Sequence, residues 1–128
     1  MNNPSSRSAS RAASFRHAFH GVGYVLKTQA NARIHAAVTL GVIALGLWLG
    51  LGRLEWAALW LAIGLVWTSE FMNTALEAVI DLASPTVHPL AKAGKDVAAA
   101  GVLLAAGAAV ATGLTVLGPP LWFRLFGG

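Results

Sequence analysis

Residues 56–81 read WAALWLAIGLVWTSEFMNTALEAVID, and this stretch decides the fold that we expect. Its first half carries no charge. The acidic and amide side chains that follow are Glu70, Asn73, Glu77 and Asp81. At about 100° per residue, these four lie within a sector of roughly 80° around a helix axis. The stretch therefore predicts one apolar helix with a polar stripe along its second half.

The composition places such a helix in a membrane. The chain has 128 residues, of which 56% are hydrophobic and only 11% are charged, whereas about 25% are charged in a soluble domain. We therefore expect one integral-membrane domain over residues 14–128. A bundle this thin encloses little by itself, so we also expect self-association. Cysteine is absent, which excludes disulfides, zinc–thiolate sites and cysteine nucleophiles.

The position of the acids points to chemistry. Ionisable groups at membrane depth are costly, and they usually face a protein interior or an aqueous pocket. The chain has only 5 acidic residues, and all but Glu55 lie between positions 70 and 96. A structural alternative stays open for each acid. Glu70 or Glu77 could pair with Arg33 or Lys95, and Asp81 could pair with a lysine at the headgroup level.

Apolar runs and turn residues divide the chain into helices, and we predict an all-α membrane protein. Residues 1–13 are polar and basic and are expected to form a disordered tail. Residues 14–29 have the spacing of an amphipathic surface helix. Three transmembrane helices are expected at about 34–51, 55–82 and 95–117. The sequence Gly118-Pro119-Pro120 is expected to end the third helix.

Basic residues set the expected orientation. Five basic residues precede the first predicted span and two follow the second: Arg7, Arg11, Arg16, Lys27, Arg33, Lys92 and Lys95. The positive-inside rule then places the N-terminus and the loop at 83–96 in the cytoplasm. The sequence pI is about 10.4. Because the basic residues are scattered around apolar spans, we expect them to meet anionic lipid headgroups and not nucleic acid.

The polar residues together resemble the parts of a phosphoryl-transfer site. Glu70 and Glu77 are about 10 Å apart along a helix axis, so one can act at a reacting oxygen and the other on a metal. Asn73 can donate and accept hydrogen bonds between them. Lys95 and Asp96 open the third helix, where a lysine and free amides suit phosphate. A phosphoryl-transfer site needs both carboxylates and cationic groups.

Two segments also resemble a known family. Residues 70–81 (EFMNTALEAVID) and residues 88–100 (HPLAKAGKDVAAA) resemble the long, specific motif of the prokaryotic integral-membrane diacylglycerol kinases, a family that includes the undecaprenol kinases of Gram-positive bacteria. The resemblance runs from about residue 15 to residue 117. Residues 31–35 (NARIH) and 88–90 (HPL) look more like the undecaprenol kinase branch.

The resemblance implies a homotrimer in the bacterial inner membrane, with three spans per chain and a cytoplasmic N-terminus. It implies transfer of the γ-phosphate of ATP, with magnesium, to a membrane lipid hydroxyl at the cytoplasmic face. The lipid, undecaprenol or diacylglycerol, stays open. By motif position, Glu70 matches the general base and Glu77 matches a metal ligand.

The resemblance also implies the residues around the nucleotide. These are Asn73, Glu77, Lys95, Asp96, Gln29 and Arg16. The family usually has a second metal-binding Glu where this chain has Gln29, whose amide oxygen is a neutral ligand for magnesium. The loop before His88 usually carries an acid that meets the nucleotide, and here Thr86 takes its place.

Two other classes of protein stay open. A small transporter or proton-relay protein would need polar residues in the outer half of the spans. Those stretches are residues 36–51, 56–67 and 101–113. They contain almost no polar residue apart from Thr39 and Thr112, which counts against this class. The third class is a catalytically impaired family member that acts as a scaffold, for which Gln29 and Thr86 are the best indications.

Overall fold

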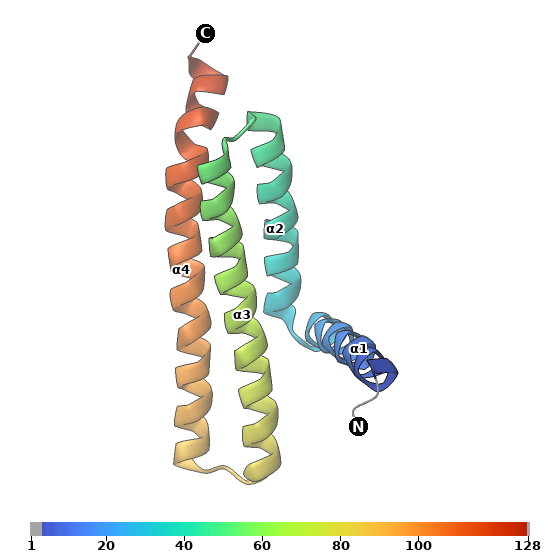
Figure 1. Ribbon diagram of the computed structural model, residues 1–128. Helices are drawn as coiled ribbons and strands as arrows, with labels where there is room; N and C mark the ends of the chain where they lie inside the picture. Colours follow the sequence, from blue (N-terminus) through green and yellow to red (C-terminus); the bar gives the residue numbers. More distant parts are fainter. Residues whose placement is uncertain (1–3, 128) are drawn as a thin grey trace.

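The computed structural model describes residues 4–127, which form four helices and no strand. The helices are α1 (Pro4–Thr28), α2 (Ala30–Leu49), α3 (Arg53–Ala83) and α4 (Pro89–Phe126). Helices α2, α3 and α4 run side by side, and α1 leaves the lower end of α2 at a steep angle (Figure 1). The prediction of an all-α protein is confirmed.

Helix α1 begins earlier than the sequence pattern predicted. It starts at Pro4, a residue that suits the first helical position because its φ angle is already helical. Residues 4–13 were expected in a disordered tail, but they are the first turns of α1; residues 1–3 lie outside the described part. The reason is composition, since alanine and arginine are strong helix formers and no glycine occurs before Gly21.

The join between α1 and α2 is a single extended residue. Gln29 has φ −101° and ψ 118°, and its N–H donates to the carbonyl of Val25 at 2.8 Å. The guanidinium of Arg33 donates to the carbonyls of Leu26 and Lys27, both at 3.3 Å. Carbonyls in the last turn of a helix lack partners within that helix. Arg33 therefore fixes how α1 leaves α2 and leaves the Gln29 side chain free to reach α3.

The turn between α2 and α3 depends on two glycines. Gly50 has φ 70°, a left-handed conformation that favours glycine, and its N–H caps α2 through the carbonyl of Gly46 at 3.1 Å. Gly46 also packs directly against the next helix. A Cβ atom built on Gly46 would lie 2.9 Å from the ring of Trp56, which is too close for a methyl group. The two helices approach closely only because position 46 has no side chain.

Helices α3 and α4 form the most extensive packing pair of the molecule. The loop at 84–88 joins them, and His88 accepts a hydrogen bond from the N–H of Leu90 at 3.2 Å. Pro89 then takes the first helical position of α4. The predicted span starts at about residue 95, and α4 begins six residues earlier, at Pro89.

Helix α4 does not end at the position that the sequence pattern predicted. It continues through Pro119 and Pro120 to Phe126, nine residues beyond the expected end at 117. Each proline removes one N–H from the helical ladder. Aromatic contacts support the turns that follow, because the rings of Trp122 and Phe126 are 4.7 Å apart and Arg124 lies 5.2 Å from the ring of Trp48 on α2.

The apolar surface is that of a membrane protein. Within residues 4–127, α2 and α4 are long and apolar enough to cross a membrane. Large apolar side chains are exposed on all four helices, among them Phe19, Leu40, Leu61 and Leu103. Exposed apolar surface on this scale marks contact with lipid or with other chains. The third span, through α3, and the homotrimer stay predictions.

Candidate functional site

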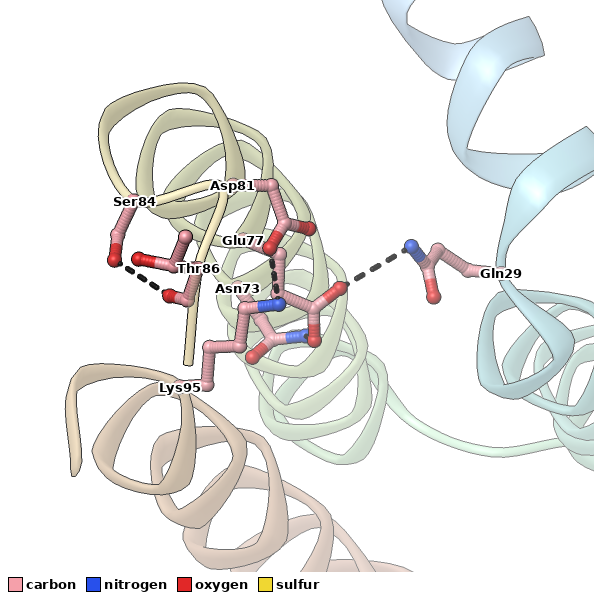
Figure 2. Close-up of polar contacts among 7 residues, drawn as sticks. All are labelled: Gln29, Asn73, Glu77, Asp81, Ser84, Thr86 and Lys95. Atoms are coloured by element: carbon pink, nitrogen blue, oxygen red, sulfur yellow. Dashed lines mark hydrogen bonds and ion pairs between the residues drawn. The ribbon is translucent and has the colours of Figure 1, made fainter. Parts of the chain in front are cut away.

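A carboxylate–amide cluster lies where the α1–α2 join meets α3. It consists of Gln29, Asn73 and Glu77 (Figure 2). The amide of Asn73 donates to one oxygen of Glu77 at 3.0 Å, and the amide of Gln29 approaches the other oxygen at 3.5 Å. Asn73 and Glu77 are one helical turn apart on α3, so they share a face. The cluster brings together residues 48 positions apart in the chain.

Glu70 lies deeper on the same face of α3. Its side chain is only 1% exposed, and it is the largest fully buried side chain among the described residues. Its Oε2 has no hydrogen-bond partner within residues 4–127. A buried carboxylate without a partner is costly. A catalytic role or a bound ion is among the explanations for such a group in a native structure.

One side chain from α2 faces this carboxylate. His35 Nε2 lies 3.9 Å from Glu70 Oε2, and the imidazole is 18% exposed. The residue pattern places His35 in segment 31–35, which resembles the undecaprenol kinases, and assigns it no role beside Glu70. Its contact depends on how α2 packs on α3, and a histidine at the start of an apolar run carries no pattern that marks such a partner.

The far end of α3 and the start of α4 form a second polar region beside a cavity. Lys95 makes an ion pair with Asp81, and Lys92 pairs with Asp96 at 2.6 Å. A pair of Asp81 with a lysine at the headgroup level was the structural alternative for this acid, and the pair with Lys95 agrees with it (Figure 2). The cavity has a volume of about 320 Å³. Its polar lining comes from Asp81, Ser84, Thr86, His88, Lys92, Lys95 and Asp96.

The charges of this region are stabilised by their partners. Lys92 lies in the first turn of α4, ahead of the predicted span at 95–117. Its hydrogen bond to Asp96 and the negative charge of that carboxylate raise the pKa of Lys92 above its usual value. Lys92 therefore stays cationic throughout the neutral pH range. Both ion pairs are more than a third exposed on the lysine side, so they add little to stability.

The sequence-predicted site residues other than Glu70 divide into three groups. Asn73, Glu77 and Gln29 contact one another. Lys95 and Asp96 lie at the cavity, where their side chains pair with other residues. Arg16 is exposed on α1, and it does not take part in the polar contacts of Glu77.

The cluster around Glu77 fits a magnesium ion that arrives with phosphates. Among residues 4–127, no group of three or more His, Cys, Asp or Glu side chains could hold a metal. Magnesium, however, is often bound by one or two carboxylates together with substrate phosphates and water. Glu77 supplies one carboxylate, and the Oδ1 atom of Asn73 is buried without a partner among these residues. Gln29 can turn its amide to present a further oxygen.

The helices and this site define an all-helical membrane protein with a carboxylate–amide cluster on one face of the bundle. Comparison with known families agrees with that class, because the profile of the family described as prokaryotic diacylglycerol kinase matches residues 16–117. The chain belongs to the prokaryotic diacylglycerol kinase family.

Two relatives show what this family contains. A diacylglycerol kinase of Synechocystis sp. is 48% identical over 109 residues, which cover 84% of this chain and 62% of the relative. An undecaprenol kinase of Bacillus subtilis is 38% identical over 108 residues, which cover 84% of this chain and 88% of the relative. The chain thus spans less than two thirds of the Synechocystis protein. Both relatives are lipid kinases by name.

Proposed function

We propose that the chain is an ATP-dependent lipid kinase of the bacterial inner membrane. It transfers the γ-phosphate of Mg-ATP to the hydroxyl of undecaprenol or diacylglycerol at the cytoplasmic face. The two relatives named above support this choice of lipids. The observation that carries the proposal is the buried, unpartnered carboxylate of Glu70, which shares a face of α3 with Glu77 and Asn73.

Glu70 acts as the general base in this proposal. As the lipid oxygen forms its bond to the γ-phosphorus, the bond from that phosphorus to the bridging oxygen breaks, and its electron pair leaves with ADP. The hydroxyl proton passes to the carboxylate of Glu70. Most of the catalysis comes from positioning and charge neutralisation, because phosphoryl transfer needs little covalent help from the protein.

The other residues hold the nucleotide. Glu77 and Gln29 would bind the magnesium ion, which neutralises phosphate charge when bound. Asn73 orients Glu77 through the hydrogen bond at 3.0 Å. Lys95 exchanges its partner Asp81 for a phosphate oxygen.

Two further residues and the assembly complete the proposal. Asp96 lines the cavity of about 320 Å³, which offers room for the nucleoside. Arg16 is close to the nucleotide in the assembled enzyme. We propose that this enzyme is a homotrimer with three spans per chain and a cytoplasmic N-terminus. The large exposed apolar surface of the single chain supports self-association.

The substitution Glu70→Gln tests the base. It keeps the size of the side chain and removes the proton acceptor, so we expect the transfer of labelled γ-phosphate to each lipid to fall by about 100-fold or more. Binding of ATP should be retained, because the nucleotide contacts proposed above are made by other residues. Wild-type turnover in Glu70→Gln would refute the assignment.

The matched control is Glu55→Gln. It makes the same chemical change on the same helix, where Glu55 accepts a hydrogen bond from the N–H of Gly52 near the α2–α3 turn. We expect its activity to stay at the wild-type level. The wild-type protein also tests the scaffold alternative, since a scaffold would phosphorylate neither lipid and would not hydrolyse ATP when lipid is added.

A further inference from the structure

The burial of Glu70 raises a question about where its proton goes. A base that accepts a proton in a water-excluded place must release it before the next turnover. The Oε2 atom of Glu70 has no hydrogen-bond partner among residues 4–127, and the side chain is 1% exposed. Water therefore has little direct access to this carboxylate, and a neighbouring side chain is needed to carry the proton.

His35 is placed to do this. Its Nε2 lies 3.9 Å from Glu70 Oε2, and the imidazole is 18% exposed. A relative movement of about 1 Å, which is within ordinary thermal amplitude, brings the two atoms to hydrogen-bond distance. The imidazole thus connects a buried carboxylate to a more accessible part of the bundle. The amide nitrogen of Asn73 donates to Glu77, and the guanidinium of Arg33 donates to carbonyls of α1.

A second contact fixes the same two helices in register. The indole N–H of Trp67 on α3 donates to the hydroxyl of Thr39 on α2 at 3.2 Å. Thr39 lies one turn after His35, and Trp67 lies one turn before Glu70, so each pair shares a helix face. The hydrogen bond therefore holds His35 opposite Glu70, and their approach is a built feature of the α2–α3 packing.

We propose that His35 is a positioning residue that acts through Glu70 and takes up its proton. This inference rests on the lipid kinase activity proposed above. After the hydroxyl proton has reached Glu70 Oε2, it moves to the Nε2 lone pair of the neutral imidazole, and the carboxylate is restored. The imidazolium that results then loses one proton to water. The net proton released equals the one that left the lipid hydroxyl, and no other reactant is needed.

The substitution His35→Ala tests the proposal in the full-length protein in lipid micelles. We expect kcat to fall by about 10- to 100-fold, the range typical of groups that support a catalytic side chain, while KM for Mg-ATP is unchanged. Added imidazole should raise the rate of His35→Ala and should leave Glu70→Gln inactive. The control is His20→Ala, which removes an exposed histidine of α1 and should behave as wild type.

A second variant separates the proton route from simple packing. Gln at position 35 can still donate a hydrogen bond to Glu70 but cannot take up a proton, so His35→Gln should be about as slow as His35→Ala. A wild-type rate in either variant overturns the proposal, and so does a failure of imidazole to raise the rate of His35→Ala. A wild-type protein that phosphorylates neither lipid would refute the proposed lipid kinase activity. That result is distinct from an active wild-type protein whose His35 variants are equally active, which would refute only the role of His35.

A measurement without turnover covers the case in which the variants fold poorly. Nitrogen NMR of histidine-labelled protein should show that Glu70→Gln shifts the Nε2 resonance of His35 and leaves that of His20 in place. An unchanged His35 resonance overturns the proposed contact.

Discussion

Three carboxylates on one stripe of α3 have three different environments. Glu70 is 1% exposed, Glu77 is half-buried, and the side chain of Asp81 is 64% exposed. Chemically similar groups can take different roles when their environments differ. In the function that we propose, the buried Glu70 acts as the base and the half-buried Glu77 binds the metal. The exposed Asp81 pairs with Lys95 at the cavity.

Part of this site could be predicted from residue spacing alone. The spacing of Asn73 and Glu77 places them on one face of a helix, and their hydrogen bond at 3.0 Å agrees with that expectation. The family motif singled out Gln29, and its amide does approach Glu77. Neither spacing nor motif predicts the contact of His35 with Glu70, because that contact exists only once α2 has packed on α3.

Position 29 provides a prediction about magnesium. Gln29→Glu places a second carboxylate beside Glu77, from which the amide is now 3.5 Å away. Two adjacent carboxylates repel one another until a cation binds between them. We therefore expect the magnesium concentration for half-maximal activity to fall by about tenfold, which corresponds to roughly 1.4 kcal/mol of added affinity. A magnesium titration of kinase activity measures this.

The control for position 29 is Gln29→Ala, which removes the amide without adding charge. It should raise the half-maximal magnesium concentration. Melting curves recorded without ATP add a second readout, since only Gln29→Glu should be stabilised by magnesium alone. If the two variants and the wild type give the same titration, then position 29 takes no part in metal binding.

Helix lengths explain the gradient of burial along the stripe. Helix α2 begins at Ala30, whereas α3 and α4 extend well beyond that level toward their shared loop (Figure 1). Helix α2 therefore packs over the stripe at Glu70 but does not extend as far as Asp81. The sequence predicts the stripe, because helical periodicity is local. It does not predict where the cover ends, because that depends on which part of α3 the shorter helix packs against.

Helix ends were the weaker part of the sequence prediction for the same reason. Pro4 begins α1, while Pro119 and Pro120 lie inside α4. A proline can mark a helix start or a helix end, and its local sequence does not decide between them. At the end of α4, the contact between Arg124 and Trp48 comes from a distant part of the chain. Tertiary contacts of this kind can keep a helix continuous through a proline that would otherwise end it.

The close packing of α2 on α3 provides a prediction about stability. A methyl group at position 46 would lie 2.9 Å from Trp56 and 3.1 Å from Leu51. Replacing glycine by alanine inside a helix normally stabilises it by about 0.5–1 kcal/mol. At Gly46 we expect the opposite sign, a destabilisation of about 1–3 kcal/mol, because the site is already filled. Denaturant unfolding in detergent micelles measures the difference.

The same helix supplies the control. Gly41 has open space around its Cα, so Gly41→Ala should be neutral or slightly stabilising. Equal effects of the two substitutions would show that the contact of Gly46 with Trp56 does not limit the packing.

At the scale of the whole molecule, the number of spans decides the topology. If α2, α3 and α4 all cross the membrane, the α2–α3 turn and the α3–α4 loop lie on opposite sides. If only α2 and α4 cross, both connections lie on one side. The chain has no cysteine, so single cysteines can be introduced at exposed positions without a background signal. Leu54 marks the turn and Val87 marks the loop.

We expect an impermeant maleimide to label Leu54→Cys from outside intact cells and Val87→Cys only after the membrane is opened. The positive-inside rule is the physical reason, because Lys92 and Lys95 follow the loop. Phe126→Cys should be labelled from the same side as Leu54→Cys. Labelling of positions 54 and 87 from the same side would contradict the three-span arrangement.

The contact between Arg124 and Trp48 has a consequence for motion. It ties the last turns of α4 to the end of α2, about 30 Å along α2 from its start near Gln29. Near the opposite end of α4, the ion pair of Lys95 with Asp81 on α3 is exposed and therefore weak. If the helices separate to admit a bulky ligand, they will pivot about the contact between Arg124 and Trp48. The displacement will then be largest at the other end of the bundle, beside the cavity.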